Sequence, residues 1–326
     1  MTKKGLALLS GGLDSTLAVK AVIDQGLEIE AVHFTTPFCN CDKCAVNEIG
    51  RNFGIPVHHI FVGQDFLDLL ADPPHGYGSQ MNICIDCRIH MFRKARELGK
   101  EIGAEFYVTG EVLGQRPFSQ RRNAMRLIER EAGLEGKILR PLSARLLPET
   151  DVEKEGVVDR DSLYAIRGRR RTPQMSLAEE LGVYDYACPS GGCLLTDPQF
   201  ARRLRDYLRH EGRPLLEDMA FLRLGRHFRL KKARVIVGRN KAENDALQSL
   251  AGRTGMPWME VSEYVGPVTV VMGDVDDNVL SKSAAITVRY SDAPRDAPID
   301  VNYFDEDVKR VKVVSISDEE LERYRI

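Results

Sequence analysis

Short apolar runs alternate with helix-like segments along the first part of the chain. Residues 5–9 have the length and composition of a buried strand, and apolar positions at helical spacing follow over residues 17–23. Further strand-like runs occur at 29–34, 57–62 and 105–111. Strands that alternate with helices predict parallel pairing, so this part is expected to form a doubly wound α/β sheet.

The rest of the chain follows a different pattern. Four short segments have the character of strands: 235–237, 268–272, 285–290 and 311–314. They predict a smaller α+β domain, and the polar stretch His210-Glu211-Gly212-Arg213-Pro214 is a plausible linker to it. The predicted domains are therefore residues 1–210 and residues 215–326.

Composition narrows the class of protein. The chain has 326 residues, a formal net charge of -2 and seven cysteines. It is no polycation, so a nucleic-acid partner would have to meet local basic patches. We expect a cytoplasmic protein without a membrane partner, because the sequence has no apolar run of membrane-spanning length and no leader-like N-terminus. Cysteines in a reducing compartment favour metal or redox chemistry over disulfides.

A glycine-containing turn joins the first strand to the first helix, with the sequence Ser10-Gly11-Gly12-Leu13-Asp14-Ser15-Thr16. Glycines permit a sharp bend and a close approach to a ligand. The helix start offers N–H donors and a favourable dipole to phosphate. A carboxylate at this place would repel phosphate unless a cation such as Mg²⁺ intervenes. The alternative is a structural turn with a capping serine.

This strand–turn–helix resembles the PP-loop of the ATP pyrophosphatases, which cleave ATP between the α and β phosphates and transfer AMP. No Gly-Lys-Ser/Thr follows the glycines, so it is not a Walker loop. The resemblance implies that the turn binds the pyrophosphate end of ATP with Mg²⁺. The residues concerned are Ser10, Gly11, Gly12, Asp14, Ser15 and Thr16.

Two further segments resemble the ThiI group of tRNA 4-thiouridine synthetases. One is Val32-His33-Phe34 with the following Pro37-Phe38, and the other is Thr109-Gly110-Glu111 followed by Gly114-Gln115 and Ser119-Gln120. Relative to the spacing in the ThiI group, this sequence has one additional residue before Ser119. The resemblance implies that His33 and Phe34 frame the adenine and that Thr109, Gly110 and Gln115 also contact the nucleotide. A buried histidine of a core strand is a nearly equal alternative for His33.

Cysteines recur at two distant places. Cys84 and Cys87 form a C-x-x-C at the start of a helix predicted over 88–102, and Cys188 and Cys193 flank a glycine pair. The MnmA group of 2-thiouridine synthetases has cysteines at similar places, which implies that the thiols converge. Three thiols suit a [4Fe-4S] cluster, four suit zinc, and a cysteine persulfide is the third alternative. The thiols at 39, 41 and 44 stay outside this assignment.

Basic residues cluster twice. Arg167, Arg169 and Arg170 belong to a run of four arginines in five residues, and residues 223–241 contain eight Lys or Arg and no acid. For each cluster the alternatives are a solvated face and a phosphate-binding surface. Residues 238–247 resemble a motif of the NFACT RNA-binding domain. The RNA-binding candidates are Arg167, Arg169, Arg170, Arg226, Lys231, Lys232 and Arg239.

Together the resemblances imply ATP-dependent tRNA thiolation. Asp14, Cys87 and Cys193 would be catalytic, with tRNA and a sulfur donor, either a persulfide carrier or free sulfide, as partners. The sequence is also compatible with a homodimer. Two rival hypotheses are a PP-loop enzyme that uses a nitrogen nucleophile, and an RNA-binding protein with a regulatory nucleotide site. Neither rival requires converging cysteines.

Overall fold

The computed structural model describes residues 3–39, 43–184, 186 and 192–326. Its contacts divide the chain into two units, Met1–Asp197 and Pro198–Ile326. The division comes before residue 210, where the sequence-based boundary was placed, because helix α8 (Pro198–His210) belongs to the second unit. In that unit Asp206 of α8 accepts hydrogen bonds from Arg229 at 3.1 Å and from Arg234 at 3.2 Å.

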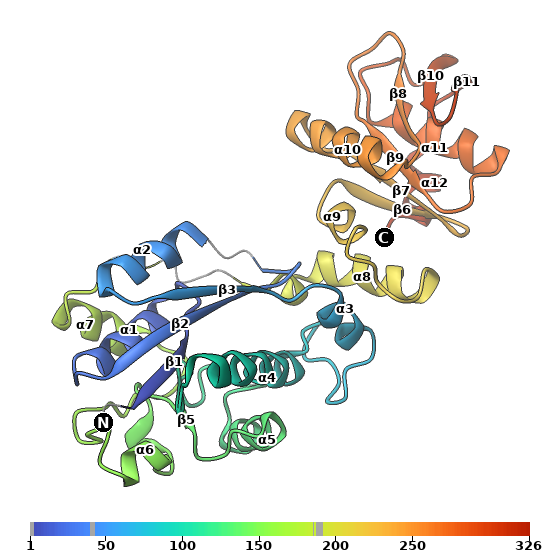
Figure 1. Cartoon of the computed structure of the whole chain (residues 1–326). Coiled ribbons are helices and arrows are strands. Elements are labelled where there is room, and N and C mark those ends of the chain that lie inside the picture. Colours follow the sequence, from blue (N-terminus) through green and yellow to red (C-terminus); the bar gives the residue numbers. More distant parts are fainter. Residues whose placement is uncertain (1–2, 40–42, 185, 187–191) are drawn as a thin grey trace. The chain divides into compact units, whose positions relative to one another are not determined.

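The first unit is built on a five-stranded sheet in the order β3-β2-β1-β4-β5 (Figure 1). All its pairings are parallel, which confirms the predicted doubly wound α/β fold. Its strands are β1 (Lys4–Leu8), β2 (Glu28–Thr35), β3 (Val57–Phe61), β4 (Phe106–Thr109) and β5 (Ile138–Leu139). Its helices are α1 (Leu13–Ile23), α2 (Lys43–Phe53), α3 (Gln64–Ala71), α4 (Cys84–Ile102), α5 (Arg122–Ala132), α6 (Asp151–Lys154) and α7 (Thr172–Glu180).

Strand β1 occupies the centre of this sheet, and its side chains are almost completely buried. Helices α1, α2 and α7 cover one face, and α3, α4 and α5 cover the other (Figure 1). Helix α1 is buried over most of its length because it lies between the sheet and α7. In a doubly wound sheet, ligands bind beyond the carboxyl ends of the strands, where β1, β2 and β4 lead into loops.

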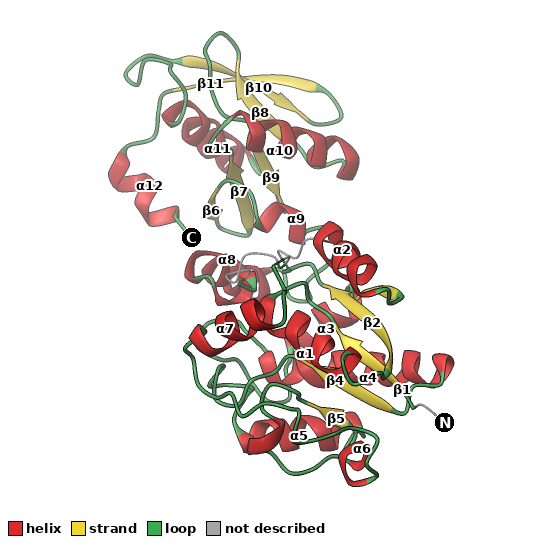
Figure 2. Cartoon of the chain, turned by 90° about the vertical axis from the view of Figure 1, so that its left-hand side faces the viewer, coloured by secondary structure: helices red, strands yellow, loops and turns green. Residues whose placement is uncertain are grey.

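The second unit contains a six-stranded antiparallel sheet in the order β11-β10-β8-β9-β7-β6 (Figure 2). This confirms the smaller α+β domain. Its strands are β6 (Arg226–Leu230), β7 (Ala233–Val237), β8 (Trp258–Val261), β9 (Thr269–Met272), β10 (Ile299–Phe304) and β11 (Val308–Val313). Its helices, besides α8, are α9 (Met219–Leu222), α10 (Lys241–Thr254), α11 (Asp277–Arg289) and α12 (Asp318–Tyr324).

One predicted strand is wrong. Residues 285–290 lie at the end of helix α11, whose N-cap Asp276 accepts a hydrogen bond from the Val279 N–H at 2.7 Å. The helix is buried on several sides, because Ile286, Thr287 and Val288 are all inaccessible to solvent. Such a helix loses the polar face that would reveal its period, and its branched residues then read as a strand.

Candidate nucleotide and thiol site

The glycine turn after β1 adopts a compact conformation. Gly11 has φ +78°, a backbone conformation that favours glycine, and Gly12 is the N-cap of α1. The Ser15 hydroxyl donates to the Gly12 carbonyl at 2.9 Å and lies 3.0 Å from the Ser10 hydroxyl. Ser15 and Thr16 are buried while Ser10 is exposed. The turn is therefore shaped by its own side chains, with the serine of its first position accessible.

Asp14 lies in the first turn of α1. One carboxylate oxygen, Oδ2, accepts a hydrogen bond from the Gln115 side-chain amide at 3.0 Å, and the Arg171 guanidinium lies 3.9 Å from it. The other oxygen, Oδ1, is buried and has no hydrogen-bond partner in the described part of the chain. A buried carboxylate oxygen without a donor is a suitable ligand for Mg²⁺.

The end of β4 lies directly against this turn. Thr109 is buried, and Gly110 comes so close that a Cβ built on it would lie 2.5 Å from the Asp14 carbonyl carbon and the Ser15 nitrogen. This position therefore accepts only glycine unless the two backbones separate. The predicted contacts of Thr109, Gly110 and Gln115 with a nucleotide are consistent with this placement, and they stay predictions.

His33 and Phe34 occupy the carboxyl end of β2, and both are buried. The His33 ring forms a hydrogen bond through Nδ1 to the Leu9 carbonyl at 2.9 Å, and it packs edge-on against His59 with ring centroids 5.6 Å apart. This histidine therefore fixes the backbone immediately before Ser10. Its role toward adenine stays a prediction.

Two segments far apart in the sequence bring cysteines together. Helix α4 begins at Cys84, earlier than the predicted 88, so Cys84 and Cys87 both lie in its first turn. The Met81 N–H donates to the Leu195 carbonyl at 3.0 Å, which joins the stretch before Cys84 to the stretch after Cys193. This backbone contact brings the two segments together, and the convergence of the thiols themselves stays a prediction.

Cys87 and Cys193 lie in surroundings that disfavour the charged forms of their thiols. Burial raises the pKa of Cys87 to about 12, and burial also raises the pKa of Cys193. Electrostatic repulsion from Cys193 and Cys84 adds to the rise at Cys87. Within the described ranges, no three His, Cys, Asp or Glu side chains form a group that could hold a metal ion. Cys188 lies outside the described residues, so the metal assignment stays a prediction.

A buried ion-pair network connects helix α4, which carries Cys84 and Cys87, to the glycine turn. The sequence did not predict this network. Glu111 directly follows Gly110 and is 1% exposed, and Arg140 is 4% exposed. Arg140 Nε donates to Glu111 at 3.1 Å, and Arg88 Nε lies 3.4 Å from the other oxygen of Glu111. Arg88 is the neighbour of Cys87. Glu111 belongs to the Thr109-Gly110-Glu111 segment that the sequence singled out, but nothing in the sequence indicated Arg88 and Arg140 as its partners.

The basic residues of the two units differ in their surroundings. In the second unit Arg239 donates to Glu243, Lys231 pairs with Asp276 at 2.7 Å, and Arg226 lies over the Tyr290 ring at 4.6 Å. Lys232 is exposed. In the first unit, the candidates Arg167, Arg169 and Arg170 are all exposed. None of those three forms an ion pair with another described residue.

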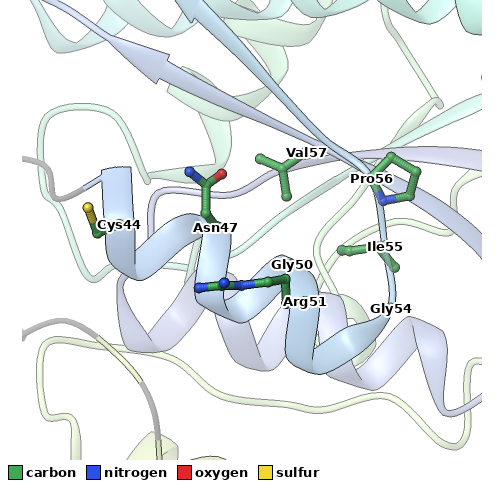
Figure 3. Close-up of a pocket in the computed structure, with 8 residues that line it drawn as sticks. All are labelled: Cys44, Asn47, Gly50, Arg51, Gly54, Ile55, Pro56 and Val57. Atoms are coloured by element: carbon green, nitrogen blue, oxygen red, sulfur yellow. The ribbon is translucent and has the colours of Figure 1, made fainter.

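A groove of about 640 Å³ lies between α2 and the segment that enters β3 (Figure 3). Cys44 and Arg51 line it from the helix, and Ile55, Pro56 and Val57 line it from the segment. Val57 is the first residue of β3, so the groove extends to the amino end of that strand. The residues that line the groove do not include those of the glycine turn or the cysteines at 84, 87 and 193.

The parallel strand order and the glycine turn after β1 are those of a PP-loop α/β domain. Residues 1–146 match the family described as thiamine biosynthesis protein (ThiI), and residues 225–325 match the NFACT protein RNA-binding domain. The chain thus joins a ThiI-family domain to a C-terminal NFACT RNA-binding domain.

Parts of the chain are similar to curated proteins and to a solved structure. A probable tRNA sulfurtransferase of Thermococcus kodakarensis is 28% identical over 48% of this chain and 39% of its own length. One from Halothermothrix orenii is 27% identical over 66% of this chain and 51% of its own length. The chain therefore spans about half or less of these relatives. A solved 4-thiouridine synthetase–RNA complex with bound ATP is 24% identical, with a TM-score of 0.39, over 68% of this chain and 52% of its own.

No helix among the described residues is both long enough and apolar enough to span a membrane.

Proposed function

We propose that this chain is an ATP-dependent tRNA sulfurtransferase. The turn from Ser10 to Thr16 would bind the pyrophosphate end of ATP, with the free Asp14 oxygen as a ligand of Mg²⁺. A uridine carbonyl oxygen attacks the α-phosphate, and pyrophosphate leaves. A sulfur nucleophile then attacks the adenylated carbon, and AMP leaves with the former carbonyl oxygen. Adenylation is needed because a carbonyl oxygen alone is a poor leaving group.

The cysteines are proposed to deliver the sulfur. Cys87 and Cys193 are the catalytic candidates, and with Cys84 they would form the three-thiol set for a [4Fe-4S] cluster, with Cys188 as a fourth candidate ligand. Soft thiol donors from two segments that meet suit such a cluster in residue type. When bound, the cluster would supply a sulfide nucleophile. A persulfide on one cysteine would supply the same atom, and zinc would instead be structural.

One arrangement carries the proposal. The Met81–Leu195 hydrogen bond brings the Cys193 segment to the start of α4, and Arg88 of α4 contacts Glu111, the residue after Gly110. Gly110 in turn lies against the backbone of Asp14. The thiols and the phosphate turn are thus linked by consecutive contacts. A nitrogen-transferring enzyme or a regulatory nucleotide site would have no need of that link.

The test separates the two half-reactions. Cys87→Ser and Cys193→Ser should abolish thiouridine formation in tRNA, measured by nucleoside analysis, while tRNA-dependent release of pyrophosphate continues. The matched control is Cys44→Ser, because Cys44 is an exposed cysteine outside the two proposed sulfur-delivering segments. Iron analysis and the absorption spectrum of anaerobically purified protein would distinguish cluster from persulfide.

Two other outcomes would favour the rivals. Full activity in both cysteine variants would indicate a different nucleophile. A wild-type chain that releases no pyrophosphate with tRNA, and whose RNA binding is unchanged by Asp14→Asn, would indicate a non-catalytic RNA-binding protein.

A further inference from the structure

Five exposed arginines gather on two neighbouring loops that both contact Asp14. We propose that these residues form a single binding surface for the phosphate backbone of RNA on the catalytic unit itself. The residues of this arginine rim are Arg116, Arg121, Arg167, Arg169 and Arg170. The inference extends the proposed function by assigning where its RNA substrate is held.

The first loop is held in a defined conformation. The Gly114 N–H donates to the Gln120 carbonyl at 2.7 Å, and the Arg116 N–H donates to the Gln120 side chain at 2.9 Å. Gln120 is itself buried, so the residue that accepts these hydrogen bonds is shielded from solvent. Arg116 is exposed and directly follows Gln115, whose amide donates to Asp14.

The second loop is joined to the first by main-chain and side-chain contacts. The Gly168 N–H donates to the Leu113 carbonyl at 2.8 Å, beside a parallel bridge between Leu113 and Arg167. The buried Ser143 hydroxyl accepts from the Leu113 N–H at 3.0 Å and donates to the Ile166 carbonyl at 2.7 Å. The two loops therefore form one rigid support for the rim.

The charge of the rim is not compensated. No rim arginine forms an ion pair within the described ranges, and all five are exposed. Asp14, which both loops contact, accepts a hydrogen bond from Gln115 and lies 3.9 Å from the Arg171 guanidinium. Guanidinium groups bind phosphate through paired N–H donors, and unpaired ones on a rigid support lose little freedom on binding.

RNA fits this surface better than ATP alone. The triphosphate of ATP is accounted for by the glycine turn, while the rim spreads over two loops and five side chains. A polyanion with phosphates at regular intervals can engage all of them, and it gains affinity from counterion release. In the second unit Arg239 and Lys231 are already paired with acids, so they offer less to a phosphate backbone.

The test measures RNA binding by the full chain without ATP or sulfur donor. Arg116→Gln, Arg169→Gln and Arg170→Gln are combined in one variant. The matched control combines Lys231→Gln, Lys232→Gln and Arg239→Gln. Affinity for unmodified tRNA is determined at several salt concentrations. We expect the rim variant to lose affinity by about tenfold or more. Its slope of log affinity against log salt should fall by roughly 2, while the control changes less.

Several results would overturn the inference. These are unchanged affinity and slope in the rim variant, a greater loss in the control, a matching loss of ATP affinity, or rim-dependent binding of an acidic protein but not of RNA. A urea-unfolding midpoint equal to that of the wild type excludes misfolding. This binding assay is independent of the thiouridine assay that tests the proposed function. If RNA binding depends on the rim but the chain forms no thiouridine, only the proposed function is refuted.

Discussion

Gly110→Ala tests whether the end of β4 must lie directly against the glycine turn. The added Cβ would lie 2.5 Å from backbone atoms of Asp14 and Ser15, whereas ordinary contact begins at 3.4 Å. The two backbones must therefore separate by about 0.9 Å, because neither contacting atom belongs to a flexible side chain. Such overpacking costs about 1–3 kcal/mol of folding free energy. A displacement of roughly 1 Å at a site of group transfer slows it by about 100-fold.

The assay is ATP-dependent pyrophosphate release, with the folded fraction determined by urea unfolding. Gly99→Ala is the control: its Cβ would lie 2.4 Å from the Tyr107 hydroxyl, in the same unit but against the far end of a side chain. It should lower stability without changing the rate per folded molecule. Wild-type kcat and KM in Gly110→Ala would refute the reasoning, because they would mean that the turn tolerates the shift.

Two further predictions concern residues that contact helix α4, namely His75, which pairs with Asp86, and Glu111, which pairs with Arg88. The hydrogen bond from His75 to Asp86 raises the pKa of His75, with a smaller contribution from Glu131, so the folded state holds that proton more tightly than the unfolded chain. The resulting stabilisation is complete below about pH 6.5 and is lost as the pH rises through the folded pKa. His75→Gln should remove that component from a series of urea midpoints against pH, and an unchanged pH profile would contradict it. Glu111→Ala should destabilise the fold by about 3–5 kcal/mol because it leaves buried Arg140 without one of its carboxylates. Glu111→Gln should cost less, and equal urea midpoints for the two variants would argue against a charge effect.

Much of the first unit could be predicted because its determinants are local. Short apolar runs bounded by turns predicted β1, β2 and β3, and the alternation with helices predicted their parallel pairing. The glycine turn was recognisable because its residues are consecutive. Partners across the fold could not be predicted in the same way. Nothing near Glu111 in the sequence indicates that Arg88 and Arg140 meet it, and nothing near Cys193 indicates the Met81–Leu195 contact.

The basic run from 223 to 241 shows most clearly why counting charges in a sequence is insufficient. The run itself contains no acid, yet Arg229 and Arg234 pair with Asp206 and Glu211, which precede it. Arg234 is 1% exposed, so its charge supports the fold and is not offered to a ligand. The shorter arginine run at 167–171 has exposed members without such partners. Available charge, rather than the number of basic residues, therefore favours the first unit over the basic run of the second as the proposed RNA-binding surface.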